Sequence, residues 1–250
     1  SASFESSVLD LQGATTLTSN GPVSFKKVNL NSKVLTLGSA STELKLTDAN
    51  TALSLSGIAL ETGPGSLTLS GALTMSGNSK LNSSGGTITL NSGGSASSGT
   101  EISLPDTTLV LQNALSLAGA TLKTKNTTLT TNDKALSLSS SSILEVDGTQ
   151  DLSGVSPDNS TTLRLTANST IDDNATLTVG TLDLANFALT LDNAMAGLSI
   201  AQPVTLDAST EQIISGAADL SLNGGISATA GTLSSTGGTL SASSFSVGAA

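Results

Sequence analysis

Short tetrads in which aliphatic and polar residues alternate recur along the whole chain. The series includes residues 34–37, 43–46, 52–55, 66–69, 87–90, 101–104, 108–111, 114–117, 135–138, 181–184, 188–191 and 219–222. A period of two places one kind of side chain on each side of an extended strand, so each tetrad predicts a strand with one buried face. The spacings of three and four residues that an amphipathic helix requires are missing.

The strands repeat at a nearly constant interval. Leu67, Ile88 and Leu109 follow one another at equal intervals, and the same interval separates Leu115 from Leu136. It is about 21 residues long and holds about three strands, and repeats of this length are typical of solenoids. We therefore expect an all-β, parallel β-helix with three short strands in each coil. The chain is long enough for about twelve coils, which at about 4.8 Å a coil would give a rod of roughly 55–60 Å.

Glycine, Asn, Asp and Ser separate the tetrads and predict the corners between strands, because these residues tolerate turn conformations. Two stretches lack the alternation: residues 91–100 have no large apolar residue, and residues 147–160 contain Pro157. We interpret both as loop insertions, since the alternation resumes after each. The chain is accordingly predicted to form a single domain over residues 1–250.

Composition excludes several classes of chemistry. The chain has no Cys and no His, and its mean hydropathy is +0.18 with 11% charged residues. Catalytic triads that need His, cysteine proteases and zinc sites built on Cys or His are therefore ruled out, and no cofactor is predicted. Disorder is also disfavoured, because disordered chains combine low hydrophobicity with high charge.

The net charge of -10 lies entirely in the second half. Residues 1–125 contain seven Lys and seven acids, whereas residues 126–250 contain Lys134 and Arg164 against twelve acids. Such a surface repels phosphate backbones, and Trp and Tyr are absent, so nucleic-acid binding is not expected. No apolar run approaches the roughly 20 residues that span a bilayer, so membrane insertion of this segment is not expected either.

The Leu-x-Leu tetrads, the Gly and Asn corners, the abundant Ser and Thr and the lack of Cys resemble the right-handed parallel β-helix of bacterial surface proteins. Autotransporter passengers and filamentous-haemagglutinin-type adhesins are the most similar. The resemblance covers nearly the whole chain but carries over no individual residue. It implies a right-handed coil, a secreted or cell-surface location in a bacterium, and a role in attachment or surface structure.

Two acids are candidates for catalysis. Some parallel β-helix proteins cleave polysaccharides with clustered acids, and Asp172 and Asp173 are adjacent. Neighbours on a strand point to opposite faces, so at most one of the two can face a given groove. A glycosidase needs two converging carboxyls, and solvated corner acids are the favoured interpretation.

A second acidic group could bind calcium. Glu145, Asp147 and Asp151 are spaced so that they could surround a hard cation together with backbone carbonyls. The ligand pattern of an EF-hand loop is absent, and a turn rich in Asp and Gly is the simpler explanation. These residues are the only metal candidates.

Outward hydroxyls suggest a third kind of site. Regular ranks of Thr on a flat solenoid face can bind ice or crystalline surfaces, but the expected outward positions mix Thr, Ser and Lys: Thr36, Lys45, Ser54, Thr68, Thr89 and Ser103. Ser and Thr also suit exposed strand positions without any ligand.

No charged residue follows Asp219, although the alternation continues to Val247. We expect either that the chain was excised from a longer solenoid, which is the favoured interpretation, or that its ends stack on a neighbour. The leading functional hypothesis is a non-enzymatic structural or adhesive rod that self-associates or meets a glycan or surface ligand. The alternative is a polysaccharide-active β-helix enzyme of the lyase or glycosidase type.

Overall fold

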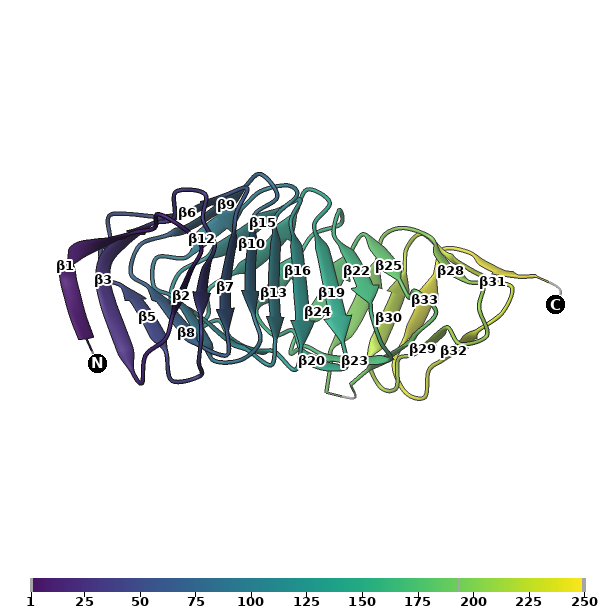
Figure 1. The fold of residues 1–250 in the computed structure, drawn as a ribbon. Helices are drawn as coiled ribbons and strands as arrows, with labels where there is room; N and C mark the ends of the chain where they lie inside the picture. The colour runs from purple at the N-terminus through teal and green to yellow at the C-terminus, as the bar shows by residue number, and fades with distance from the viewer. Residues whose placement is uncertain (1, 193, 249–250) are drawn as a thin grey trace. The chain divides into compact units, whose positions relative to one another are not determined.

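The computed structural model describes residues 2–192 and 194–248, and these residues form strands, turns and bends without a helix. The strands are parallel and hydrogen-bond to strands about one coil away in sequence (Figure 1). The predicted all-β solenoid is confirmed, with coils of about 21 residues and about 12 turns. No helix among the described residues is long and apolar enough to cross a membrane.

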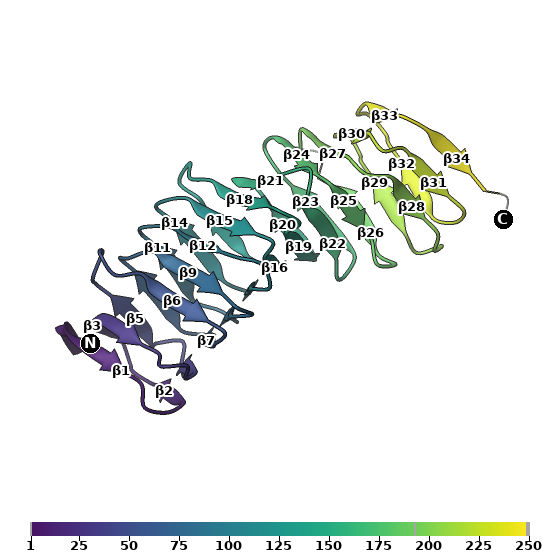
Figure 2. The same cartoon turned by 90° about the horizontal axis from the view of Figure 1, so that it is seen from above.

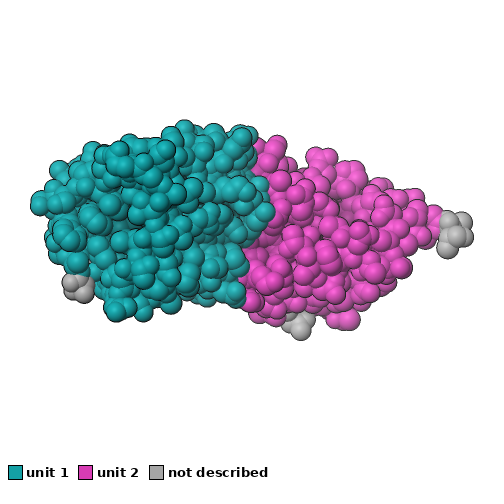
Figure 3. All heavy atoms as spheres, in the orientation of Figure 1, with its two compact units in different colours: residues 1–123, 127–137 teal, residues 124–126, 138–250 magenta. Residues whose placement is uncertain are grey.

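The chain divides into two compact units (Figure 3). Unit 1 comprises Ser1–Lys123 and Thr127–Ser137, and unit 2 comprises Thr124–Asn126 and Leu138–Ala250. That residues 1–250 fold as one domain stays a prediction.

Unit 1 has three faces, and the chain visits them in rotation. The first face holds β1 (Ala2–Asp10), β3 (Pro22–Asn29), β5 (Glu43–Leu46), β8 (Ser66–Leu69), β11 (Thr87–Leu90), β14 (Thr108–Leu111) and β17 (Thr128–Thr130). The second holds β6 (Leu53–Ser56), β9 (Leu73–Ser76), β12 (Gly94–Ala96) and β15 (Leu115–Ala118), which Figure 2 shows side by side. The third holds β2 (Thr15–Leu17), β4 (Leu35–Leu37), β7 (Ala59–Gly63), β10 (Lys80–Ser83), β13 (Glu101–Pro105) and β16 (Thr121–Lys125).

Unit 2 repeats the coil. The strands β19 (Ile143–Asp147), β22 (Thr162–Leu165) and β25 (Thr181–Asp183) are hydrogen-bonded neighbours, and a five-stranded sheet holds β20 (Thr149–Asp151), β23 (Ser169–Asp172), β26 (Ala188–Leu191), β29 (Gln212–Ile214) and β32 (Thr232–Ser234). A third holds β24 (Thr176–Val179), β27 (Gly197–Ile200), β30 (Asp219–Leu222) and β33 (Leu240–Ala242). The last holds β28 (Val204–Leu206), β31 (Ile226–Ala228) and β34 (Phe245–Val247). The strand β21 (Val155–Pro157) neighbours β18 (Leu136–Ser139).

The core is a set of stacked aliphatic residues. Ile88 lies opposite Leu67 on one side and Leu109 on the other, each one coil away, as the sequence predicts. All three side chains are buried. Burying such a side chain contributes about 1.5–3 kcal/mol, so the alternation within each tetrad supplies the driving force for coiling.

Buried hydroxyls complete the corners. Thr62 Oγ1 donates to the carbonyl of Asn82, 3.2 Å away, and Thr124 Oγ1 donates to that of Glu145 at 3.1 Å. Likewise, Thr161 Oγ1 donates to the carbonyl of Leu138 at 3.1 Å. All three threonines are buried, so part of the abundant Ser and Thr satisfies backbone carbonyls between coils.

The two predicted loop insertions are wrong. Within residues 91–100, β12 pairs in register with β9 and β15, the strands one coil away on either side. A Cβ on Gly94 would collide with the Leu73 carbonyl oxygen, so a small residue is required where the strands pack closely. Within residues 147–160 lie β20 and β21, and the coil from Ile143 to its partner Thr162 is shorter than the regular coils of unit 1.

Candidate functional site

The three calcium candidates have other partners. An Arg164 nitrogen lies 3.4 Å from Glu145 Oε1, and Lys125 Nζ lies 3.0 Å from Asp147 Oδ2. Asp151 Oδ1 accepts a 2.8 Å hydrogen bond from the Ser153 amide. Among the described residues, no group of three or more acidic side chains is placed to hold a metal ion. Glu145, Asp147 and Asp151 therefore do not form a cluster of calcium ligands in this structure.

Arg164 is the centre of an ion-pair ladder on β19, β22 and β25. Glu145, Arg164 and Asp183 are register partners on these three strands. Arg164 Nε donates to Asp183 Oδ2 at 2.8 Å, and this hydrogen bond is the main reason that the pKa of Arg164 is raised above its ordinary value. The only arginine is thus neutralised by acids on both neighbouring coils.

Asp172 and Asp173 lie on opposite sides of the chain. Asp172 ends β23 and is half-buried, and it is the register partner of Asp151 on β20. Its Oδ1 is buried and has no hydrogen-bond partner within the described residues. Asp173 is only 5% exposed, and its Oδ1 accepts a 3.0 Å hydrogen bond from the Ala175 amide.

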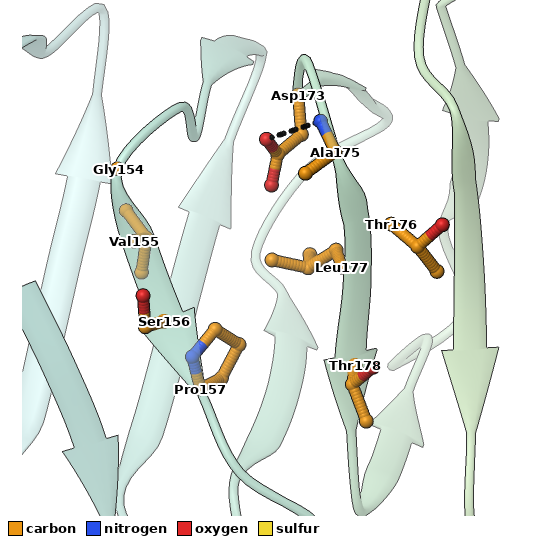
Figure 4. Close-up of a pocket in the computed structure, with 9 residues that line it drawn as sticks. All are labelled: Gly154, Val155, Ser156, Pro157, Asp173, Ala175, Thr176, Leu177 and Thr178. Atoms are coloured by element: carbon orange, nitrogen blue, oxygen red, sulfur yellow. Dashed lines mark hydrogen bonds between the residues drawn. The ribbon is translucent and has the colours of Figure 1, made fainter.

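Asp173 lines a cleft where two strands separate (Figure 4). The cleft has a volume of about 360 Å³, and residues 154–157 of one coil and 175–178 of the next complete its lining. Here β21 is the last strand of one sheet and β24 is the first of another. Pro157 in β21 has no amide hydrogen to donate, which limits pairing along this strand.

The cleft holds one carboxyl and no second acid among its lining residues. Burial is the main cause that raises the pKa of Asp173 above its ordinary value of 3.8, and the nearby Asp151 and Asp172 charges raise it further. A raised pKa suits a general acid, but glycoside hydrolysis also needs a carboxylate across the bond. The cleft supplies half of that arrangement.

A second hollow lies between β25 and β28. It has a volume of about 420 Å³, and its charged lining residues are Arg164, Asp183, Asp207 and Glu211. Arg164 is already paired with Asp183, so negative charge predominates in the lining. An acidic polysaccharide would be repelled here rather than bound.

A third hollow, of about 490 Å³, opens at the corner that precedes β23, β26 and β29 and carries no charged residue in its lining. Its one aromatic side chain is Phe187, which no pattern in the sequence singled out as a site residue. The available signal was its rarity, since the chain has four Phe and no Trp or Tyr.

The six predicted outward hydroxyl and lysine positions belong to three different faces. Thr36 and Ser103 lie on the face of β4 and β13, Lys45, Thr68 and Thr89 on that of β5, β8 and β11, and Ser54 on that of β6. Sorted by face, one rank in unit 1 carries only hydroxyls: Ser54, Thr74, Ser95 and Ser116. Ser54 and Thr74 are hydrogen-bonded through their hydroxyls at 2.9 Å.

No protein-family model matches this chain, and no curated protein or solved structure is significantly similar to it. The resemblance to bacterial surface β-helices therefore stays a prediction beyond the level of the β-solenoid fold.

Proposed function

We propose that this chain is a non-enzymatic structural or adhesive β-solenoid, secreted or displayed on a bacterial surface. The observation that carries the proposal is the chemistry of its faces. Outward positions are occupied by hydroxyls, as on β6, β9, β12 and β15, and by charges paired across coils, as at Arg164. Faces of this kind suit broad, shallow contact with a surface or a glycan.

The coil itself supports a structural role. Within each sheet, the strands other than the two at its ends pair with strands of the coils before and after them, so stability accumulates through nearest-neighbour contacts. Such a fold can present a repeated surface without a central catalytic pocket.

Self-association is a further part of the proposal. Leu240, Phe245 and Val247 on β33 and β34 are 43%, 62% and 70% exposed. Apolar side chains exposed at this level favour association, and light scattering over a concentration series measures it. A species that stays monomeric at the highest concentrations would remove this part of the proposal.

A polysaccharide-active enzyme is the alternative function, and buried Asp173 in its cleft is the observation that favours it. The single carboxyl in that cleft argues against it.

The test compares binding with cleavage. The purified chain is incubated with insoluble and soluble polysaccharides, neutral and acidic, and both the bound protein and the newly formed chain ends are measured. We expect binding without cleavage. Cleavage that is lost in Asp173→Asn but retained in Asp158→Asn would favour the enzyme instead, and absence of binding to every surface would remove the adhesive role.

A further inference from the structure

The corner hollow in unit 2 spans three consecutive coils. Asn168 precedes β23, Asn186 and Phe187 precede β26, and Ser209 and Thr210 precede β29, which begins with Gln212. The three strands are hydrogen-bonded neighbours, and Figure 2 shows them in succession. Two strand spacings of about 4.8 Å make this footprint about 10 Å long, which suits one or two sugar rings.

Phe187 is presented by a tight turn. Its amide donates to the Leu184 carbonyl at 2.8 Å, and the two central residues, Ala185 and Asn186, have φ values of 50° and 72°. Positive φ at both central positions is the pattern of a type I′ turn, which Asn tolerates and Ala does not favour. Unit 1 uses the same pattern at Leu30–Lys33, with Asn31 and Ser32 at its centre and Lys33 in the place of the aromatic ring.

Hydrogen bonds from backbone amides fix the position of the polar rim of the hollow. Asn168 Oδ1 accepts a 2.9 Å hydrogen bond from the Ala188 amide, which fixes its side chain. Glu211 is only 7% exposed, and its Oε2 accepts hydrogen bonds from the amides of Asp207 at 2.8 Å and Ala208 at 3.2 Å. This carboxylate closes the loop that carries Ser209 and Thr210.

Four other polar side chains on the rim of the hollow are available to hydrogen-bond a ligand. Within the described residues, no hydrogen bond joins the side chains of Asn186, Ser209, Thr210 or Gln212 to another protein group. These side chains supply two amides and two hydroxyls beside a half-buried phenyl ring. Amides and hydroxyls both donate and accept, as do the hydroxyls of a sugar.

The lining excludes other classes of ligand. It has no Lys or Arg to bind a phosphate or carboxylate, and no acid to bind a cation. An extended peptide would need a free strand edge, but β26 is paired on both sides, with β23 and with β29. The class of ligand that suits this lining is therefore a neutral molecule with an apolar face and several hydroxyls.

We propose that the hollow around Phe187 is a binding site for a neutral saccharide. The C–H face of a sugar ring packs on the phenyl ring, and its hydroxyls bond to the rim of Asn186, Ser209, Thr210 and Gln212. This inference rests on the proposed adhesive function and names the ligand class of one site within it.

The test titrates the full chain with neutral oligosaccharides of glucose, xylose, mannose, galactose and N-acetylglucosamine. Binding is followed by saturation-transfer NMR and calorimetry. We expect at least one series to bind, and Phe187→Ala to weaken that binding by about fivefold, because an aromatic contact is worth roughly 1 kcal/mol. Asn186→Gly keeps the positive φ and removes only the amide, so it should weaken binding by a smaller factor.

Phe4→Ala is the matched control, since it removes an exposed phenyl ring from β1 in unit 1, outside the hollow, and should leave the affinity unchanged. Phe187→Leu retains an apolar side chain but has no aromatic face. If this variant binds weakly and its melting temperature is unchanged, the loss of binding comes from lost stacking and not from unfolding.

The failures are distinguishable. Equal affinities for wild type and Phe187→Ala would overturn the site and leave the adhesive function standing. The same conclusion would follow if the wild-type protein bound polysaccharide surfaces but no neutral oligosaccharide. If the wild-type protein bound neither surfaces nor oligosaccharides, the saccharide site and the adhesive function would both be overturned.

Discussion

The central coils of unit 1 and the coils of unit 2 follow the same plan but differ in how regularly it repeats. In the centre of unit 1, the register partners Leu67, Ile88 and Leu109 follow one another at equal intervals, whereas the earlier coil from Leu35 to its partner Leu60 is longer. In unit 2, Leu144, Leu163 and Leu182 belong to shorter coils, whereas a longer coil separates Leu189 from its partner Ile213. The inward leucines stay in register in both, so the corners absorb the difference.

That difference teaches where a solenoid acquires individual features. The long coil between Leu189 and Ile213 carries the loop that Glu211 closes and part of the rim of the Phe187 hollow. The coils of unit 1 instead present repeated side chains, such as the hydroxyl rank from Ser54 to Ser116. A shared core therefore permits both a uniform face and a specific site.

Charge separates the two units as well. In unit 1, Glu101 lies between Lys80 at 3.6 Å and Lys123 at 2.9 Å. In unit 2, the charges of Asp151 and Asp172 help to raise the pKa of Asp173, and no ion pair joins these three acids to a Lys or Arg of the described chain. In unit 1, by contrast, hydrogen bonds lower the pKa of Asp10 and Asp48.

The largest expected effect tests whether the core is equally important in both units. Leu90→Ala in unit 1 and Leu220→Ala in unit 2 each truncate a fully buried side chain and should lower the free energy of unfolding by about 2–5 kcal/mol. Urea unfolding measures both. If the chain is one domain, each variant shifts the same transition, and a shift confined to one of two transitions would contradict the single domain.

The close packing of β12 on β9 in unit 1 requires the small residue Gly94. We expect Gly94→Ala to destabilise the chain by about 1–3 kcal/mol, because the added Cβ meets the Leu73 carbonyl. Gly13→Ala is the matched control, since a Cβ there meets nothing within 4 Å. Thermal unfolding of both variants is the measurement. A harmless Gly94→Ala would restore the interpretation of residues 91–100 as a loop.

The ion-pair ladders should differ in strength. Arg164→Met removes the cation between Glu145 and Asp183 and should cost about 1 kcal/mol, whereas Lys80→Met leaves Glu101 paired with Lys123 and should cost about 0.5 kcal/mol or less. Unfolding at low and high salt checks this, because salt screens the pairs and should narrow the gap. If the two variants lost equal unfolding free energy at every salt concentration, an electrostatic origin of the stabilisation would be contradicted.

The smallest effect concerns Asp173 and pH. Because its folded pKa is raised above 3.8, its protonation stabilises the folded state below that value, and this gain is lost as the pH rises through the folded pKa. Asp173→Asn should therefore be more stable than wild type at neutral pH and lose that advantage in acid.

Asp158→Asn should change the free energy of unfolding in the opposite direction when both variants are unfolded over the same pH series. Hydrogen bonds from Ser160 lower the pKa of Asp158, so its contribution is present above 3.8 and disappears as the pH falls through the folded pKa. Identical pH profiles for the two variants would contradict the assigned burial of Asp173.

Much of the fold could be predicted from the residues. Tetrads such as 66–69 and 87–90 became strands, and the inward leucines took the predicted spacing. The prediction was wrong at residues 91–100 because β12 has only Gly94 and Ala96 inward, so no apolar pattern marks it. Its strand is defined by hydrogen bonds to β9 and β15 and not by its own hydrophobicity.

The candidate sites were harder to predict. Glu145 and Asp147 look like calcium ligands in sequence, yet the cations that pair with them, Arg164 and Lys125, lie 19 residues later and 22 residues earlier in the chain. Local spacing does not reveal such partners.

The sequence by itself determined the strand period, the approximate length of the coil and the apolar core, because alternation along one strand decides which face is buried. Only the tertiary structure decided which outward side chains meet. Asn168, Phe187 and Gln212 belong to three successive coils of unequal length, and they come together because each coil's length sets the register of its corners. A small change in the length of a corner leaves the leucine core intact but alters which polar and aromatic groups become neighbours.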